Sequence, residues 1–375
     1  MMRVERLSFR SGLQMDMPLL FTVVAIATLG VVNLYSATSC YADARADIYV
    51  SQIYWIVVGM LLSIVVVAID YRFFERLAVV LYLGGFVLLG LVFVLAADIR
   101  GSSRWIQIGS FTFQPSEFMK ILVILMVARS LHGDTDTEPR SLFDLAPPFL
   151  YVLGPAAAVM AQPDFGTAMI YLLTTLTVLA MTKIRRGSAL FLVGGAVPAA
   201  YIVWNYVMRD YQRSRIESFL NPEANKTGAG WHALQSQTAI GNGGLTGEGF
   251  MQGTQNQFGF LPDQHSDFPF AVFAEDWGFI GSLVLLSLYC FLCVWAMHIA
   301  SEAKDRFGAA VATGVGALLF WHIVFNLGMT VGYLPVVGIT LPLFSYGGSS
   351  IVTAMVGLGL LMNVSMRRQS GAKYV

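Results

Sequence analysis

The strongest constraint on this sequence is a series of long apolar runs that recur along its length. Most contain about 17 to 25 residues, enough to cross the hydrocarbon core of a bilayer as an α-helix. Only 12% of the residues are charged, whereas an ordinary soluble domain carries about a quarter. We therefore predict an all-α polytopic membrane protein, a single integral-membrane domain over residues 1–375, with about ten transmembrane helices at 17–37, 51–69, 77–97, 115–131, 145–162, 165–182, 188–207, 268–299, 307–331 and 343–366.

The positions of Lys and Arg predict the orientation of these helices. Ten spans place both termini on one side, and short cytoplasmic loops of membrane proteins are rich in basic residues. If both termini are cytoplasmic, that side holds fifteen of the 23 Lys and Arg residues, and the short loops of the other side hold three. Four more lie in one long outer loop, and the rule does not count basic residues in long loops. The last, Lys120, lies within a span. We expect cytoplasmic termini.

Two outer segments differ from ordinary connections. Residues 98–114 alternate polar and apolar side chains around Gly109-Ser110, a pattern typical of a β-hairpin with a two-residue turn. Residues 208–267 form a connection far longer than is usual in a compact bundle. Their aromatic residues and glycines argue against disorder. We expect a small hairpin, and a large ordered extracytoplasmic loop between the seventh and eighth helices.

Composition and motifs exclude several classes of function. The formal net charge is zero, so no global basicity indicates a nucleic-acid partner. The glycine-rich stretch 241–244 lacks the lysine and the preceding strand of a P-loop, which argues against an ATPase. Cys290 and Cys293 lie within an apolar run without the His or further Cys of a zinc site. We predict that they are ordinary residues of a membrane helix.

Three acidic residues lie where the long loop becomes the eighth apolar run. Asp267 precedes Pro269, which suits the first turn of a helix. Its carboxylate is therefore expected near a helix N-terminus, where either Ser266 or Asp267 could act as a simple cap. Glu275 and Asp276 lie two turns further along, where a charge costs about 3 kcal/mol. We expect one of them to face the bundle interior, with a structural ion pair as the alternative.

The start of the fourth run supplies a second group. Pro115 suits the first helical position, and Glu117 and Lys120 share one helix face because they are three residues apart. They form either a self-contained ion pair or part of a site. The predicted topology places them on the same side of the membrane as Asp267. We expect an outward-facing cavity that contains Lys120, Glu117, Asp267 and Arg104, since charges within a membrane usually face the interior or water.

A third group precedes the tenth run, in residues 334–350. It includes Ser345, Gly347, Gly348 and Ser349. Glycines and hydroxyls at a helix N-terminus can hold a phosphate. Small residues equally permit close packing of helices, so both interpretations stay open.

Together these motifs resemble the SEDS family (shape, elongation, division and sporulation), in the order in which that family has them. The resemblance rests on residues 101–106, 113–120, 162–168, 228–232, 239–244, 253–278 and 342–350. The Ala-Ile-Gly-x-Gly-Gly and Gly-Thr-Gln-x-Gln sequences are more similar to the RodA branch than to the FtsW branch. Ser266, Pro269 and Asp276 depart from the usual residues of the family.

The resemblance implies a ten-span bundle and a peptidoglycan glycosyltransferase of the bacterial cytoplasmic membrane. Such an enzyme polymerises lipid II into glycan strands at the outer leaflet, here in cell elongation and shape. The implied partners are a class B penicillin-binding protein, membrane proteins of the elongation complex, the nascent glycan strand and membrane lipid. The family's essential aspartate maps to Asp267. We expect an inverting displacement in which Asp267 takes a proton from the acceptor hydroxyl as pyrophosphate leaves.

Further residues are expected to bind the substrate. Arg104 and Lys120 would stabilise the pyrophosphate. No cofactor is required by the sequence, although a divalent cation, Mg²⁺ or Mn²⁺, could assist. The complete set of expected substrate-binding residues is Arg104, Gln114, Ser116, Glu117, Lys120, His265, Ser345, Gly347, Gly348 and Ser349.

Two alternative functions remain open. A helix bundle with intramembrane charges also suits a transporter or a flippase of lipid-linked precursors. A flippase needs a route to the inner leaflet, however, and the charges lie at the outer end. The second alternative is a noncatalytic scaffold for the penicillin-binding protein, with Asp267 as a helix cap.

Overall fold

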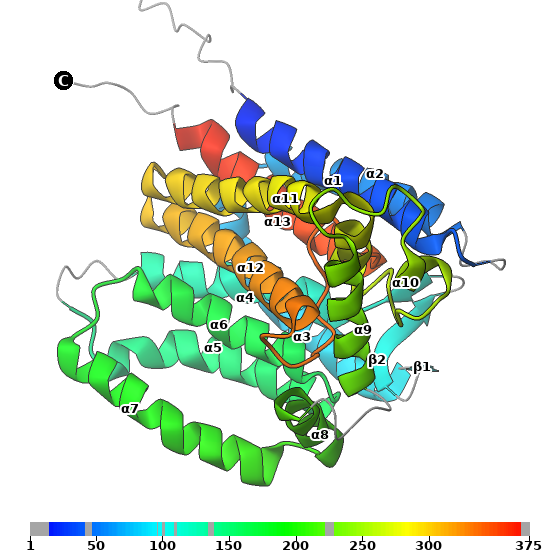
Figure 1. The fold of residues 1–375 in the computed structure, drawn as a ribbon. Coiled ribbons are helices and arrows are strands. Elements are labelled where there is room, and N and C mark those ends of the chain that lie inside the picture. Colours follow the sequence, from blue (N-terminus) through cyan, green and yellow to red (C-terminus); the bar gives the residue numbers. More distant parts are fainter. Residues whose placement is uncertain are drawn as a thin grey trace, which may run out of the picture.

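The structure is a computed structural model that describes residues 15–41, 47–95, 97–99, 102–108, 111–133, 139–221 and 229–368. Each of the ten predicted spans corresponds to a helix (Figure 1), and the predicted break at residues 162–164 is confirmed. The helices are α1 (Met17–Thr38), α2 (Ile48–Ala68), α3 (Tyr71–Leu95), α4 (Pro115–His132), α5 (Leu142–Ala161), α6 (Phe165–Ala180), α7 (Arg186–Ile202), α11 (Pro269–Ser301), α12 (Arg306–Val331) and α13 (Gly348–Arg368).

Eight helices in the described part of the chain are long and apolar enough to cross a membrane. The two that fall short of this criterion are α4, which carries Glu117, Lys120 and Arg129, and α6, which has 16 residues. Both pack against α12, and α4 is buried along most of its length. The charges of α4 can therefore face protein instead of lipid.

The starts of α3 and α13 differ most from the prediction, whereas the other helix ends lie within about three residues of it and η2 (Val203–Val207) brings α7 to the predicted end at residue 207. Helix α3 begins at Tyr71 instead of residue 77, because its first six residues include Arg72, Glu75 and Arg76 and therefore lie outside the apolar run. Helix α7 continues into η2, a short π-helix. Helix α13 begins at Gly348 instead of residue 343, because a turn precedes it in which Ser345 Oγ accepts a hydrogen bond from Leu341 N.

Hydrogen bonds at both ends of α1 fix its direction relative to α11. Asp16, before α1, accepts a hydrogen bond from Trp295 near the end of α11, at 2.8 Å. Near the other end, Ser36 donates to Asp276 in the first turns of α11. The two helices are therefore antiparallel. The small sheet and the loop helices lie at the opposite end of the bundle from the C-terminus of α13 (Figure 1).

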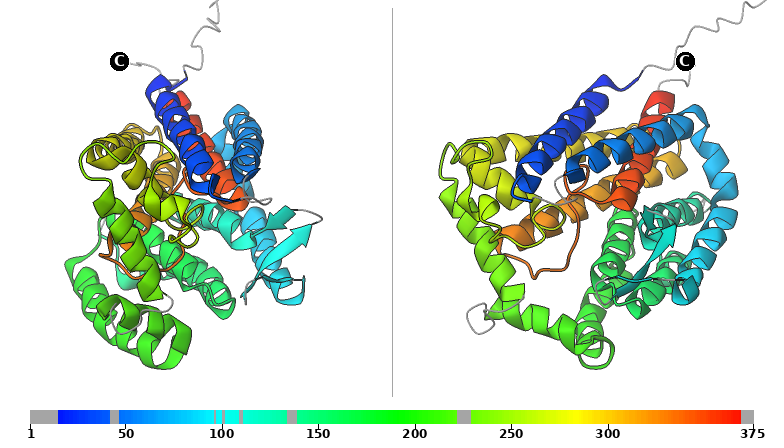
Figure 2. Two further views of the ribbon diagram at one scale, coloured as in Figure 1. Left: turned by 45° about the vertical axis from the view of Figure 1, so that its right-hand side comes forward. Right: turned by 90° about the vertical axis from the view of Figure 1, so that its right-hand side faces the viewer.

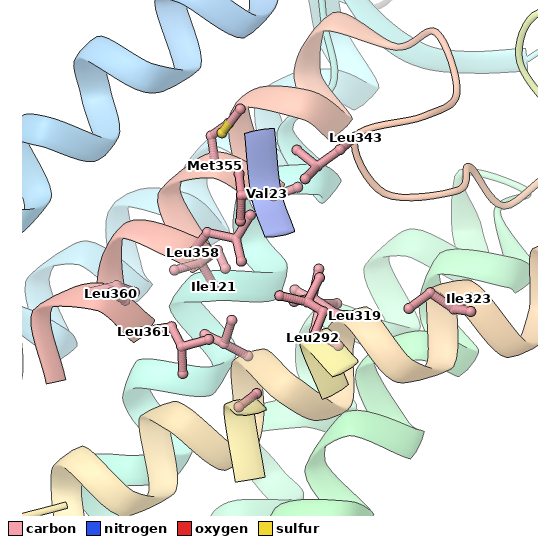
Figure 3. Close-up of a cluster of buried hydrophobic side chains, with 14 of the residues drawn as sticks. Val23, Ile121, Leu292, Leu319, Ile323, Leu343, Met355, Leu358, Leu360 and Leu361 are labelled. Atoms are coloured by element: carbon pink, nitrogen blue, oxygen red, sulfur yellow. The ribbon is translucent and has the colours of Figure 1, made fainter. Parts of the chain in front are cut away.

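The core lies where α4, α12 and α13 meet. Ile121 from α4, Leu319 from α12 and Leu358 from α13 belong to one cluster of buried side chains, with Val23 of α1 and Leu292 of α11 beside them (Figure 3). Between helices in lipid, close packing of this kind supplies the attraction, because lipid tails are as apolar as the side chains. Helix α7 lies at the edge of the bundle and is largely exposed (Figure 1).

The predicted hairpin is confirmed. Strand β2 (Ser102–Ile108) pairs antiparallel with β3 (Phe111–Phe113), with Ile106 opposite Phe113. A third strand, β1 (Ala97–Ile99), pairs with the other edge of β2 and was not predicted. The predicted turn residues Gly109 and Ser110 lie outside the described residues. This sheet leads directly into α4 and positions Arg104 near the N-terminus of that helix.

The long segment 208–267 is ordered in its described parts, as expected. It contains α8 (Asp210–Leu220), α9 (Ala229–Asn242) and α10 (Thr254–Gln257). Residues 222–228 are not among those that the structure describes. Helix α9 packs against α11 and α12, and it runs beside their ends in both views of Figure 2. The segment thus covers one end of the bundle.

A break in α11 explains the glycine cluster of this segment. Gly278 has non-helical dihedral angles (φ 64°, ψ −161°) inside the helix, and the segment 244–249 fills the break. The N–H groups of Phe279 and Ile280 donate to the carbonyls of Gly244 and Leu245, and the carbonyls of Glu275 and Asp276 accept from Glu248 and Gly249. Backbone groups released by the break are therefore satisfied by the loop.

Candidate active site

Asp267 lies directly before α11 but does not cap it. The N-cap residue is Phe268, no side chain makes a capping hydrogen bond, and Pro269 occupies the first helical position as predicted. The Ser266 hydroxyl instead bonds to the carbonyl of Asp263. The expectation that Ser266 or Asp267 caps the helix is therefore wrong. The reason is that a turn closed on the Asp263 carbonyl places the helix start one residue later.

The backbone of Asp267 is held by α12. Asn326, which is fully buried, donates from Nδ2 to the Asp267 carbonyl at 3.0 Å and to the Ile339 carbonyl at 2.8 Å. One amide group thus ties the start of α11 to the loop between α12 and α13. This double contact fixes Asp267 relative to that loop.

Asp267 is partly exposed as a residue, and its carboxylate faces Gly338. A Cβ atom at Gly338 would lie 3.5 Å from Asp267 Oδ2, and Gly338 has a φ of +73° that favours glycine. Part of Asp267 is therefore accessible, while its carboxylate has a defined neighbour. This combination is what a group that contacts a substrate requires.

The surroundings of Asp267 shift its pKa toward neutral pH. Burial, assisted by the nearby Asp263 carboxylate, raises the pKa of Asp267 to about 6. The positive charges of Arg215 and Arg104 and a hydrogen bond from Ser266 act in the opposite direction. A carboxylate whose pKa lies just below neutral pH is an effective general base.

Two of these neighbours were not among the predicted site residues. Arg215 lies on α8 and donates from its guanidinium to the Val336 carbonyl at 3.2 Å. Asp263 lies in the turn before Asp267. Both belong to the long loop, in which no sequence spacing connects a side chain to α11. Only the folding of that loop over the end of the bundle brings them near Asp267.

Arg104 is anchored by a carboxylate at the start of α6. Its guanidinium lies 3.2 Å from Asp164 Oδ2, and Gln114 Nε2 donates to the same oxygen at 3.2 Å. Asp164 also caps α6 by accepting from Thr167 N at 3.1 Å. Arg104 keeps about 30% of its side-chain surface exposed, so it can still meet an anion. Asp164 belongs to the Gln-Pro-Asp motif, yet it was not assigned a role.

Gln114 joins the sheet to the C-terminal helix. Its backbone N–H donates to Ser349 Oγ at 3.1 Å, and Gln114 is nearly buried. The neighbouring Ser116 is also buried, and its carbonyl accepts from Tyr171 at 2.6 Å. In this structure both residues contribute to the packing around the candidate site.

Lys120 lies inside the protein and is paired there. Its Nζ is 2.7 Å from Glu117 Oε1 and 3.0 Å from Nε2 of His322 on α12. Lys120 is 3% exposed and Glu117 is 7% exposed. The geometry therefore favours the self-contained ion pair, extended by His322, which the sequence did not predict.

Lys120 and Asp267 nevertheless belong to the same wall of the site. Lys120 contacts His322, whose Nδ1 lies 3.0 Å from the Thr340 carbonyl. One helical turn away, Asn326 binds the carbonyls of Asp267 and of Ile339, the neighbour of Thr340. Residues four apart share one helix face. Contacts with α12 thus link the two predicted groups. Lys120 is buried, whereas Asp267 is partly exposed.

The residues before α13 are engaged within the protein. Ser345 Oγ accepts from Leu341 N, and Ser349 Oγ accepts from Gln114 N. A Cβ atom at Gly348 would lie 2.5 Å from the Trp55 ring, whereas at Gly347 it would meet Ser350 at an ordinary 3.5 Å. These contacts favour the packing interpretation of this segment over the phosphate-binding one.

His265 connects this segment to Asp267. The His265 carbonyl accepts from Tyr346 N at 2.8 Å, and the ring lies between those of Tyr41 and Tyr346, with centroids 6.5 and 6.1 Å away. The side chain is mostly buried. His265 thus orients the turn that carries Asp267.

Glu275 and Asp276 are both buried, so the expectation that only one faces inward is wrong. Glu275 accepts from the N–H groups of Gln255 and Asn256, at 2.9 and 3.2 Å, at the start of α10. Asp276 accepts from Ser36 of α1. Within the described residues both carboxylates are hydrogen-bonded instead of ion-paired. The broken helix allows adjacent side chains to reach different neighbours.

The described residues contain no group of three or more His, Cys, Asp or Glu side chains that could hold a metal ion. The divalent cation expected from the sequence therefore has no complete protein-made site in this part of the chain. Asp267 and Asp263 are the carboxylates nearest the candidate active site, and the cation stays a prediction.

Comparison with known proteins adds independent information. A family model described as a cell cycle protein, and named for FtsW, RodA and SpoVE, matches residues 17–370. The peptidoglycan glycosyltransferase MrdB of Escherichia coli strain K12 is 40% identical over 347 residues, which cover 91% of this chain and 92% of that protein.

Two solved structures have a similar fold. A chain of a peptidoglycan synthase complex, described as coordinating polymerization and crosslinking, matches with a TM-score of 0.81 at 31% identity, over 95% of this chain and 99% of that one. The crystal structure of the rod shape determining protein RodA from Thermus thermophilus matches with a TM-score of 0.71 at 30% identity, over 96% and 99% of the two chains. The resemblance seen in the motifs is confirmed.

Proposed function

This chain belongs to the family of cell cycle proteins that includes FtsW, RodA and SpoVE, and from this membership we infer that it is a multi-pass membrane enzyme, a peptidoglycan glycosyltransferase. We propose that it polymerises lipid II into glycan strands at the outer leaflet of the cytoplasmic membrane, during cell elongation. The charge distribution of the loops supports this orientation. The similarity to MrdB and RodA supports the role in elongation.

We further propose that it works with a class B penicillin-binding protein, which crosslinks the strands. The support is the similarity to a chain of a peptidoglycan synthase complex that coordinates polymerization and crosslinking. A bundle whose helices α2, α3 and α7 expose long apolar faces has ample surface for membrane-embedded partners.

The single observation that carries the mechanism is the carboxylate of Asp267. Asp267 is partly exposed, it does not cap α11, and its pKa is raised to about 6. In the proposed step, the 4-hydroxyl oxygen of the acceptor attacks the anomeric carbon of the donor. The bond from that carbon to the pyrophosphate oxygen breaks, and the pyrophosphate leaves with the electron pair. Asp267 takes the hydroxyl proton. One base and one stabilised leaving group suffice for inversion.

Arg104 and Arg215 are the groups best placed to receive the pyrophosphate. Both act electrostatically on Asp267, and they come from different elements, β2 and α8. Guanidinium groups bind phosphates with paired hydrogen bonds, and their positive charge stabilises the developing negative charge of the leaving group. A divalent cation would also stabilise the negative charge of the leaving group, and the phosphates of the substrate would supply part of its ligands.

Lys120 has a different role in this proposal. It is buried between Glu117 and His322, so it does not contact the headgroup. Its connection through His322 to Thr340 makes it a positioning residue for the loop that faces Asp267.

The test is polymerisation of lipid II by the purified protein with its penicillin-binding partner. Asp267→Asn keeps the shape of the side chain and removes the base, so glycan synthesis should fall by about 10²- to 10⁴-fold. A matched control is Glu275→Gln, a buried carboxylate that we place outside the reaction. Near-normal polymerisation by folded, partner-bound Asp267→Asn would refute the assignment.

The same preparation separates the alternative functions. A scaffold predicts no glycan product from the wild-type complex when the transpeptidase is inhibited. A flippase predicts that the protein alone moves labelled lipid II between the leaflets of a vesicle. The proposal expects glycan chains in the first assay and no translocation in the second.

A further inference from the structure

A second polar site lies at the opposite end of the bundle from Asp267. A cavity of about 320 Å³ opens between the end of α4, the end of α6 and the start of α12. Its lining includes Arg140, Lys183 and Arg306, which come from three different connections. The catalytic proposal uses none of them.

The charged residues that line this cavity are all basic. Its lining residues in the described part of the chain include three basic side chains and no carboxylate. Arg306 is the first residue of α12, whose N-terminus is capped by the Asp305 carboxylate through a hydrogen bond from Gly308 N, so the positive field comes from the basic side chains and not from the helix end. Three basic side chains around one cavity favour an anion.

The backbone fixes two of the basic residues relative to one another. Arg140 N donates to the Lys183 carbonyl at 2.8 Å, and Arg185 N donates to the Arg140 carbonyl at 3.0 Å. These bonds tie the segment before α5 to the segment after α6. Backbone hydrogen bonds therefore hold the segments that carry Arg140 and Lys183 together, so the two basic residues do not lie on independent loops.

The remaining wall is apolar and reaches the surface of the bundle. It includes Leu131, Val178 and Met181. Met181 is 60% exposed, and it follows α6 at the edge that would meet lipid. A positive pocket next to an apolar outer surface matches a phospholipid, whose phosphate is anionic and whose tails are apolar.

We propose that this cavity binds the phosphate headgroup of an anionic phospholipid such as phosphatidylglycerol, in the leaflet that faces the chain termini. The charge distribution of the loops predicts that this is the cytoplasmic leaflet. Arg140, Lys183 and Arg306 hold the phosphate, and the acyl chains lie along the apolar wall beside Met181. The site is separate from Asp267 and does not depend on the glycosyltransferase assignment.

The chain's own carboxylates are the competing occupants. Asp144 acts electrostatically on Arg140, and the Asp305 carboxylate caps α12 directly before Arg306. If these groups neutralise the pocket, lipid retention will not depend on the basic lining residues. The experiment therefore compares lining and non-lining charges on the same face.

The full-length protein is purified in mixed micelles that contain equal amounts of phosphatidylglycerol and phosphatidylethanolamine, and the retained lipids are counted by native mass spectrometry. The test variant is Lys183→Gln/Arg306→Gln, with Lys183→Gln alone as a milder change if the double variant does not fold. The control is Lys304→Gln, which removes one charge two residues from Arg306 without touching the cavity.

Wild type and Lys304→Gln should retain phosphatidylglycerol in preference to phosphatidylethanolamine. The double variant should lose that preference, with retention weakened about tenfold or more, since each basic side chain attracts an anionic headgroup. Equal retention by wild type and the double variant would overturn the proposal, as would equal loss in Lys304→Gln. Displacement of the lipid by millimolar inorganic phosphate would overturn the lipid assignment in favour of a soluble anion.

Discussion

The guanidinium of Arg104 lies 3.2 Å from the carboxylate of Asp164, which connects the small sheet to the first turn of α6. Asp164 is almost buried, whereas Arg104 remains partly exposed and acts electrostatically on Asp267. The pair therefore holds a positive charge beside the candidate base. It also connects a strand to a helix some sixty residues further along the chain.

Replacement of Asp164 should change substrate binding more than folding. Asparagine caps helices as well as aspartate does, so Asp164→Asn keeps the contact with Thr167 while it releases Arg104. We expect KM for lipid II to rise about tenfold, as expected for about 1.4 kcal/mol of lost binding. Arg104→Gln should show a similar rise. Arg209→Gln, an exposed arginine at the same end, is the matched control, and an equal effect there would contradict the assignment.

The rate of polymerisation should fall in acid. With a pKa of about 6 for Asp267, the rate should drop about tenfold for each pH unit below that value, because the base becomes protonated. Asp263 raises this pKa, so Asp263→Asn should move the acid limb to lower pH. The check is a pH–rate profile of kcat for wild type and Asp263→Asn. An unshifted limb would mean that another group titrates.

Loss of the Asp267 charge should not weaken the fold. The pKa of Asp267 is higher in the folded protein, about 6, than its ordinary value of 3.8. Its favourable contribution to folding is therefore present below pH about 4 and is lost as the pH rises through 6. At pH 7, Asp267→Asn should leave thermal stability equal or higher, by at most about 3 kcal/mol. The gain should vanish at pH 4. A clear loss of stability at pH 7 would indicate a structural role.

The buried pair of Glu117 and Lys120 should respond differently to single and double changes. Lys120→Met leaves the Glu117 charge without its partner, which typically costs about 3 to 5 kcal/mol. Glu117→Gln/Lys120→Met removes both charges and should recover much of that loss. Thermal unfolding followed by fluorescence-detected size exclusion measures the difference. Additive losses in the double variant would show that the pair is not coupled.

The loop that fills the break in α11 should tolerate no side chain at its contact points. A Cβ atom at Gly247 would lie 2.1 Å from the Asp276 carbonyl, and φ at Gly247 is +87°. Gly247→Ala should therefore destabilise the protein by well over about 1 kcal/mol. At Gly241 a Cβ atom meets nothing within 4 Å, so Gly241→Ala should be neutral or slightly stabilising. Similar melting temperatures for both variants would contradict the packing.

The positions of the ten helices and of the hairpin could be predicted from the sequence. Hydropathy and alternation are local properties, and a helix in lipid must satisfy its own backbone, so an apolar run of sufficient length leaves few alternatives. The helix ends were less predictable. Helix α13 begins only after a turn that the Ser345 hydroxyl closes, and α3 begins in a charged segment before its apolar run. The motifs also predicted Asp267 as the catalytic residue, which stays a prediction, but they did not predict its surroundings.

What the tertiary structure decided is which groups meet around Asp267. Asp164, Arg215 and His322 come from segments distant in sequence, and no spacing rule links them to Asp267 or Lys120. Tertiary packing also decided that Lys120 is buried and that Asp267 is partly exposed, although both were expected in one outward-facing cavity. The physical reason is that sequence periodicity gives the face of a helix, whereas the neighbour of that face depends on how all the helices pack together.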